Sequence, residues 1–175
     1  MKIGFIGRFQ PFHIGHKHVV EQFSDEELVI VIGSAGESRT DENPLNSDER
    51  EEIIRECLPE IDIFHVEDFE SDEEWREEVL AKTEVEAVVS GNERAQEIMK
   101  EEVEVVEPDY RNPEVYSGSE VRRRIKGGEE WSYLVPECAR EKLREFEDRI
   151  RKSGTQYEFE PGWKKENAYR GTAGN

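Results

Sequence analysis

The sequence is poor in cysteine, and its two cysteines lie far apart. Cys57 and Cys138 have no neighbouring cysteine in a chain of 175 residues. Disulfide-rich folds and zinc clusters need several cysteines at short spacing, so the sequence excludes both classes. We therefore expect both thiols to be reduced, in a reducing compartment.

Long hydrophobic runs and net positive charge are also missing. The first apolar stretch ends at Arg8, too early for a signal peptide, and no run reaches membrane-spanning length. The formal net charge is −19, a sign that repels nucleic acid and anionic lipid. We expect a soluble cytoplasmic protein that binds neither nucleic acid nor membrane.

The basic residues that are present form two islands in the acidic chain. Residues 1–20 contain three basic residues and no acidic one, and residues 117–128 contain four basic residues against Glu120. These islands predict a local anion site, whereas most of the carboxylates are expected to face water on helix surfaces.

Short apolar runs alternate with segments that begin with helix-capping signals. The runs of strand length are 3–6, 28–32, 61–64, 87–89 and 103–106. Helices are expected over 14–23, after the capping pairs Asn46/Glu49, Ser71/Glu74 and Ser117/Glu120, and from Pro136 to about Ile150. This alternation predicts an α/β fold with a doubly wound parallel sheet.

The length of the chain favours one domain. We expect this domain to span residues 1–152 and a C-terminal extension to span residues 153–175, where glycine and proline recur.

The loop after the first expected strand is the first place to seek a site, because ligands of such sheets bind beyond the carboxyl ends of the strands. The loop contains neither G-x-G-x-x-G nor a P-loop. It offers Arg8, His13 and His16 beside an expected helix N-terminus, which favours phosphate. Gly15 is expected to let a nucleotide approach the backbone. A surface or metal-binding histidine pair is the alternative.

Two motifs carry a resemblance to a known family. Residues 7–16, Gly-Arg-Phe-Gln-Pro-Phe-His-Ile-Gly-His, resemble the signature of the nucleotidyltransferase superfamily that shares its fold with class I tRNA synthetases. Their Gly-Arg-Phe-Gln-Pro opening is similar to archaeal-type nicotinamide mononucleotide adenylyltransferases. Residues 116–124 resemble the same family's C-terminal Ser-x-[Ser/Thr]-x-x-Arg phosphate motif. The resemblance covers about residues 1–150.

Weaker matches lie between the two motifs. Residues 43–50 resemble the family's loop into its second helix, and residues 90–92 resemble its turn after a strand. Residues 45–48 depart from the Phe-Thr-Ala-Gly that is common there. Ser119 stands where threonine is more usual, which preserves the hydroxyl.

The resemblance implies a Rossmann-like nucleotidyltransferase fold and a specific reaction. The 5′-phosphate of nicotinamide mononucleotide would attack the α-phosphorus of ATP, giving NAD and pyrophosphate. The attacking phosphate is already an anion, so the enzyme needs to orient it and to stabilise charge, and needs no nucleophile of its own. Mg²⁺ is expected to bind mainly through the ATP phosphates, since the sequence shows no compact carboxylate cluster for a metal. Homo-oligomers are common in the family, which implies one here.

The resemblance also implies roles for individual residues. The expected catalytic residues are His16, His13, Arg8 and Arg122. The expected ATP contacts are Gly7, Arg8, Phe9, His13, Gly15, His16, Ser117, Ser119 and Arg122. The expected contacts of nicotinamide mononucleotide are Gln10, Arg50, Trp75 and Asn92, with Trp75 stacking on the nicotinamide ring and Arg50 binding the phosphate.

Plainer alternatives exist for several of these residues. Trp75 could pack in the core, and Arg50 could form a surface ion pair. Arg123 and Arg124 are expected to pair with nearby acids and not to touch ATP.

Two other functions stay open. An adenylyl- or cytidylyltransferase with another acceptor, such as pantetheine phosphate or flavin mononucleotide, is disfavoured because those families usually have Asp-Pro where this chain has Gln10-Pro11. A nonenzymatic nucleotide-binding module is disfavoured because Arg8, both histidines and Arg122 are all retained.

Overall fold

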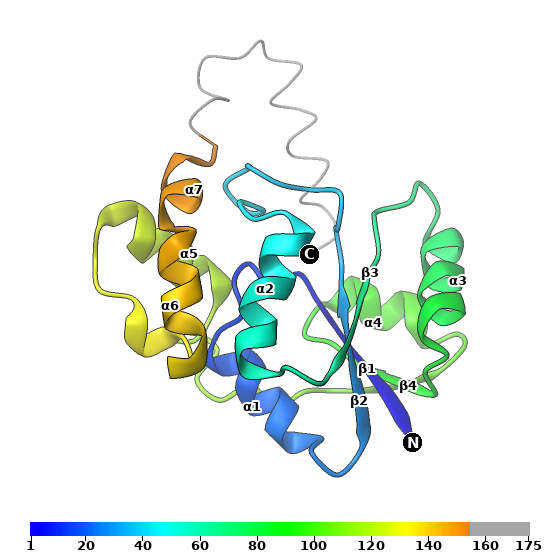
Figure 1. Ribbon diagram of the computed structural model, residues 1–175. Coiled ribbons are helices and arrows are strands. Elements are labelled where there is room, and N and C mark those ends of the chain that lie inside the picture. Colours follow the sequence, from blue (N-terminus) through cyan, green and yellow to red (C-terminus); the bar gives the residue numbers. More distant parts are fainter. Residues whose placement is uncertain (155–175) are drawn as a thin grey trace.

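A single parallel sheet organises the chain, with its strands in the order β3-β2-β1-β4-β5 (Figure 1). The structure is a computed structural model that describes residues 1–154. Most of the expected extension, residues 155–175, lies outside the described residues. The strands are β1 (Lys2–Gly7), β2 (Glu27–Ile32), β3 (Asp62–His65), β4 (Ala87–Val89) and β5 (Glu104–Val106). All five expected strands are therefore confirmed, as is the doubly wound parallel sheet.

Helices follow the strands in the expected alternation. They are α1 (Ile14–Gln22), α2 (Ser47–Cys57), α3 (Asp72–Thr83), α4 (Glu93–Met99), α5 (Gly118–Gly127), the 3₁₀ turn η1 (Ser132–Leu134), α6 (Glu137–Glu145) and α7 (Glu147–Lys152). Asn46, Ser71 and Ser117 each accept a hydrogen bond from the backbone N–H three residues later, so the three predicted capping residues are confirmed.

The sheet separates two apolar layers, because successive strand residues face opposite sides. On β2, Ile30 and Ile32 join a cluster formed with α1, α2 and α5 to α7, whereas Val29 and Val31 join a second cluster formed with α3 and α4. Helices thus cover both faces. The chain order reverses between β1 and β4, which leaves an opening at their carboxyl ends.

The C-terminal helical region differs from its prediction. One helix was expected from Pro136 to about Ile150, but α6 ends at Glu145 and α7 starts at Glu147, with the buried Phe146 between them. The break lets Ile150 on α7 pack into the same core cluster as Leu143 on α6.

The expectation of two reduced cysteines is wrong. Cys57, at the end of α2, and Cys138, near the start of α6, form a disulfide across a sequence separation of 81 residues. The packing of α6 against α2 brings the two together, which spacing along the chain could not reveal. Within residues 1–154, no helix combines the length and the apolarity needed to cross a membrane.

Candidate active site

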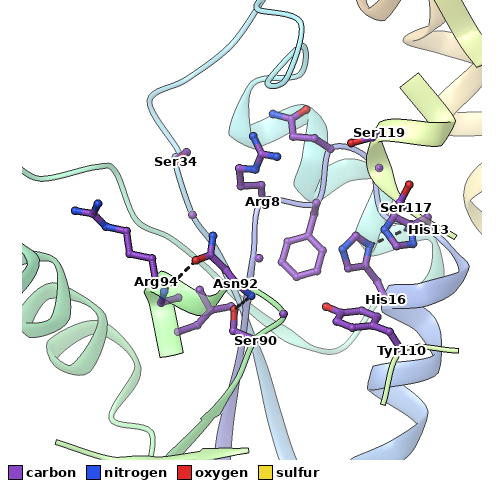
Figure 2. Close-up of a pocket in the computed structure, with 18 of the residues that line it drawn as sticks. Arg8, His13, His16, Ser34, Ser90, Asn92, Arg94, Tyr110, Ser117 and Ser119 are labelled. Atoms are coloured by element: carbon purple, nitrogen blue, oxygen red, sulfur yellow. Dashed lines mark hydrogen bonds between the residues drawn. The ribbon is translucent and has the colours of Figure 1, made fainter. Parts of the chain in front are cut away.

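A cleft of about 460 Å³ lies at the carboxyl end of the sheet, where the strand order reverses (Figure 2). Its walls come from the segments that follow all five strands, which is where a doubly wound sheet binds ligands. The loop after β1 lines its centre, as the sequence predicts. Most of the predicted site residues line this cleft: Gly7, Arg8, Phe9, Gln10, His13, His16, Trp75, Asn92, Ser117, Ser119 and Arg122.

The two histidines form the N-terminal cap of α1. His13 is the N-cap residue, and its Nδ1 accepts a hydrogen bond from the backbone N–H of Gly15 at 3.0 Å. His16 reaches back, and its Nδ1 accepts the backbone N–H of His13 at 3.1 Å. With both Nδ1 atoms acting as acceptors, a neutral ring carries its proton on Nε2. The cap therefore makes both rings Nε2–H donors.

Burial keeps both rings neutral. It lowers the pKa of His13 to about 3, with a smaller effect from the charge of Arg122. It also lowers the pKa of His16 well below the ordinary histidine value. Phe12 stacks on the His16 ring with centroids 5.6 Å apart, and Phe9 lies at 4.7 Å. At neutral pH the pair offers N–H donors without adding positive charge.

Gly15 has a different role from the expected one. It does not line the cleft. A Cβ atom at this position would lie 2.8 Å from Cε1 of His13 and 3.2 Å from the carbonyl oxygen of Tyr116. Glycine is therefore needed to accommodate the protein's own His13 ring and the segment before α5.

Arg122 joins the two sequence motifs. Its Nη1 donates to the Gln10 carbonyl at 2.7 Å and its Nη2 donates to Ser119 Oγ at 3.3 Å, across 112 residues of sequence in the first case. A Cβ atom on Gly118 would lie 2.9 Å from Nη1 of Arg122, so glycine permits this close approach. The N-termini of α1 and α5 thus face one cleft and favour anions there.

Arg8 is oriented by the loop that precedes α2. Its Nη1 donates to Asn43 Oδ1 at 3.1 Å and to the Glu42 carbonyl at 3.4 Å. Burial and the nearby Arg122 lower the pKa of Arg8 to about 10. Both arginines remain cationic at neutral pH, so the centre of the cleft is positive.

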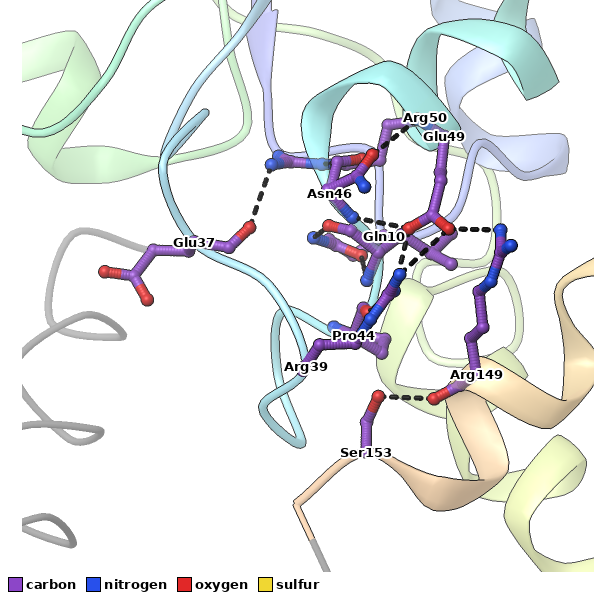
Figure 3. Close-up of polar contacts among 10 residues, drawn as sticks. Gln10, Glu37, Arg39, Pro44, Asn46, Glu49, Arg50, Arg149 and Ser153 are labelled. Atoms are coloured by element: carbon purple, nitrogen blue, oxygen red, sulfur yellow. Dashed lines mark hydrogen bonds and ion pairs between the residues drawn. The ribbon is translucent and has the colours of Figure 1, made fainter. Parts of the chain in front are cut away.

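The structure contradicts phosphate binding by Arg50. Its side chain is fully buried, does not line the cleft, and directs all five N–H donors at backbone carbonyls. Figure 3 shows one of these bonds, to the carbonyl of Glu37. The surface ion pair considered as the alternative is wrong as well. The acceptors are the carbonyls of Asn46, Arg8, Gly33, Ser34 and Glu37. Arg50 therefore holds the loops after β1 and β2 together and is not free to bind a ligand.

Gln10 is likewise engaged within the protein. Its Nε2 donates to the Leu45 carbonyl at 2.8 Å and its Oε1 accepts the Leu45 N–H at 3.0 Å. Gln10 lines the cleft, but both ends of its amide hold the loop before α2. At the end of this loop Asn46 and Glu49 form a capping box, and Glu49 pairs with Arg39 and Arg149 (Figure 3).

Trp75 and Asn92 lie on the α3–α4 side of the cleft. Trp75 is half-buried; it packs on the second core cluster and also lines the cleft. Its stacking on a nicotinamide ring stays a prediction. Asn92 caps α4, where its Oδ1 accepts the Ala95 N–H at 3.0 Å. The expected pairing of Arg123 and Arg124 with nearby acids is confirmed, because both pair with Glu120.

Several lining residues are not among the predicted site residues. Ser34, Asp68 and Tyr110 lie in the connections after β2, β3 and β5, and Ser90 begins the turn at 90–92 that resembles the family's. Asp72 and Arg94 lie in the first turns of α3 and α4. Tyr110 is placed by a close contact, because a Cβ atom on Gly91 would lie 2.6 Å from its ring. Some of these residues directly follow a predicted strand, and that position could have identified them as candidate site residues.

Acidic side chains in the cleft are few. Asp68 and Asp72 line it, and Asp68 accepts a hydrogen bond from Ser34 Oγ at 3.1 Å. Within residues 1–154, His, Cys, Asp and Glu side chains nowhere gather in a group of three or more that could hold a metal ion.

Two solved proteins that share the fold of this chain are named adenylyltransferases. A bifunctional NMN adenylyltransferase/ADP ribose pyrophosphatase from Francisella tularensis, crystallised with AMP and a manganese ion, aligns with a TM-score of 0.70 at 20% identity, over 90% of this chain and 53% of that one. The present chain thus spans about half the length of that bifunctional protein. A putative nicotinate-nucleotide adenylyltransferase from Vibrio parahaemolyticus aligns with a TM-score of 0.58 at 15% identity, over 86% and 95% of the two chains. These matches show the Rossmann-like nucleotidyltransferase fold.

Sequence comparison shows the family. The cytidylyltransferase-like family model matches residues 4–124. Nicotinamide-nucleotide adenylyltransferase from Halobacterium salinarum is 36% identical over 151 residues, which cover 82% of this chain and 85% of that protein. The proteins of the same name from Methanosarcina barkeri and Methanococcus aeolicus are 35% and 36% identical, over 82% and 78% of this chain and 87% and 84% of theirs. The chain belongs to the nicotinamide-nucleotide adenylyltransferase family, within the cytidylyltransferase-like proteins.

Proposed function

We propose that this protein transfers the adenylyl group of ATP to nicotinamide mononucleotide and releases NAD and pyrophosphate. One observation carries the proposal. Two N–H-donating histidines, Arg8 and Arg122 line the same cleft, and the N-termini of α1 and α5 face that cleft as well. The family membership supplies the identity of the two substrates.

The donors on the α1–α5 side fit the triphosphate of ATP. Ser117 and Ser119 lie at the N-terminus of α5 beside Arg122, where hydroxyl, guanidinium and backbone N–H groups can bind the β- and γ-phosphates. Gly7 and Phe9, the other proposed ATP contacts, also line the cleft. Pyrophosphate would leave from the α1–α5 side of the cleft, which is positively charged.

His13 and His16 stabilise the charge that develops on the α-phosphate. Their Nε2–H groups are held by the cap of α1 and need no protonation to donate, so they are ready at neutral pH. Preorganised donors of this kind lower a barrier because they do not reorient during the reaction. Arg8, oriented by Asn43, would hold the attacking phosphate in line. No protein nucleophile takes part.

Trp75 and Asn92 are our candidates for contacts with the nicotinamide ring on the α3–α4 side. Gln10 acts indirectly, by fixing the loop at Leu45. Arg50 is withdrawn from the set of ligand contacts, because its five donors bind backbone carbonyls.

A divalent cation, which we propose to be Mg²⁺, fits this cleft if ATP supplies most of its ligands. Asp68 and Asp72 are carboxylates in the lining, and no protein cluster of three ligands is available within the described residues. When bound, the cation neutralises phosphate charge.

Residues 1–152 are proposed to form the transferase domain, with 153–175 as an extension. The cytoplasmic location and the homo-oligomeric state stay predictions of the sequence.

A panel of acceptors tests the proposed function. Purified protein with ATP and Mg²⁺ is offered nicotinamide mononucleotide, flavin mononucleotide or pantetheine phosphate, and pyrophosphate release is measured. We expect release with nicotinamide mononucleotide and at most a trace with the others. Release only with another acceptor would transfer the proposal to that substrate, and release with none would reject it.

A further inference from the structure

The two sides of the cleft differ in chemistry. Figure 2 shows His13, His16, Ser117 and Ser119 on one side and Arg94 with Asn92 and Ser90 on the other. The α3–α4 side also carries apolar and aromatic side chains: Phe69, Trp75, Ala95 and Ile98. One side therefore suits phosphates and the other suits a flat ring.

The inference rests on the proposed function, which places the phosphates on the α1–α5 side. The base of the acceptor is then left with the α3–α4 side. The pyridinium ring of nicotinamide mononucleotide is a cation, which an indole face attracts. Asp68 and Asp72 also line this part of the cleft and favour positive charge.

Arg94 is the group on this side that could reverse that preference. A free guanidinium binds a carboxylate with two parallel hydrogen bonds and would attract a ring bearing a carboxylate. In the structure, Nη2 of Arg94 instead donates to Oδ1 of Asp72 at 2.8 Å. The pair joins the first turn of α3 to that of α4 and offsets the charge of Arg94.

We propose that the Asp72–Arg94 ion pair makes the cleft select an acceptor ring with a neutral carboxamide over one with a carboxylate. Asp72 contributes twice: its charge repels a carboxylate, and it occupies the arginine that would bind one. The specificity then comes from Asp72 repelling the competing substrate, whose ring bears a carboxylate.

The expected effect is modest and depends on salt. The side chains of Asp72 and Arg94 are both 55% exposed, so water weakens their interactions. Removing Asp72 should raise the ratio of kcat/KM for nicotinic acid mononucleotide to kcat/KM for nicotinamide mononucleotide by about fivefold, the scale of one exposed charge pair. Added salt should shrink this change, because exposed charges are screened.

The experiment measures this ratio for the full chain and its variants. Asp72→Asn removes the carboxylate and keeps the shape, Arg94→Gln removes the cation, and a double variant combines them. Glu73→Gln is the matched control, because Glu73 is the next residue of α3, is exposed and does not line the cleft.

We expect the unaltered protein to prefer the amide, Asp72→Asn to raise the ratio, and Arg94→Gln to lower it. The double variant should lose most of the gain, because the gain depends on the released arginine. The inference is overturned if the unaltered protein prefers the acid, if Asp72→Asn matches Glu73→Gln, or if the double variant keeps the full gain. Failure of the unaltered protein to use either acceptor would instead reject the proposed function.

Discussion

The backbone N–H of His13 donates a hydrogen bond to Nδ1 of His16, at 3.1 Å. This bond fixes the tautomer of a buried ring, so Nε2 of His16 carries the hydrogen. The same feature that begins helix α1 therefore prepares a donor for the reaction.

The variant His16→Asn separates the cap from the catalytic donor. The asparagine Oδ1 takes about the place of the histidine Nδ1 and can still accept the His13 N–H, but the Nε2–H group is lost. We expect turnover to fall by about a hundredfold or more, the scale of one transition-state donor, with little change in melting temperature. His16→Ala should lose the same activity and also some stability.

Steady-state kinetics and thermal unfolding check this prediction together. Activity of His16→Asn within threefold of the unaltered protein, a margin of about 0.7 kcal/mol, would show that His16 is only a cap.

The two histidines should stay neutral far below the ordinary histidine pKa. We expect NMR of ¹³C-labelled histidine to show no titration of His13 or His16 near pH 6.5, because burial holds the pKa of His13 at about 3 and that of His16 well below its usual value. Resonances are assigned with His13→Asn and His16→Asn. A midpoint near pH 6.5 for either ring would contradict the buried, neutral pair.

The same pKa shifts predict how stability depends on pH. A histidine whose pKa is lowered by folding binds fewer protons in the folded state than in the unfolded state. Its contribution is fully present above pH 6.5 and is lost as the pH falls from 6.5 toward about 3. Urea unfolding across this range should show a smaller loss for a variant without both histidines.

Arg50→Lys tests the structural role of Arg50. Lysine keeps the charge but has at most three donors, so at least two of the five hydrogen bonds to backbone carbonyls are lost. We expect the free energy of unfolding to drop by about 3 kcal/mol, since each hydrogen bond to a charged group contributes roughly 1.5–3 kcal/mol. Unchanged stability with a raised KM for nicotinamide mononucleotide alone would show that Arg50 binds the phosphate instead.

Gly118→Ala tests the contact between the two motifs. The new methyl group would lie 2.9 Å from Nη1 of Arg122 and 3.1 Å from the Gln10 carbonyl, so Arg122 must move. We expect kcat/KM to fall by about tenfold or more, because misplaced phosphate ligands are costly. Gly127→Ala, on the same helix, is the control: its methyl group would meet only the flexible side chain of Glu129 and should leave activity unchanged. Equal activity of the two variants would contradict the role given to this contact.

Local signals predicted most of the fold. Ser117 and Glu120 mark a helix start because the capping bond joins residues three apart, and the strands are visible as apolar runs. Arg50 could not be understood in this way, since its acceptors come from loops up to 42 residues away that only the folded sheet brings together. For the same reason, the sequence could not predict the disulfide partner of Cys57, which is 81 residues away.

The site was predictable where motif residues act locally. His13 and His16 share one helix turn, so their common direction followed from spacing. Arg94 and Asp72 are separated by 22 residues and meet only because α3 and α4 lie on the same side of the sheet.

Transfer of an adenylyl group from ATP to nicotinamide mononucleotide makes one NAD and one pyrophosphate in each turnover. The most direct test mixes the unaltered protein with ATP, Mg²⁺ and nicotinamide mononucleotide and quantifies NAD and pyrophosphate over time. We predict that the two products form in equal amounts and that both form about a hundredfold or more slowly with His16→Asn. Binding of ATP without formation of either product would contradict the proposed transfer.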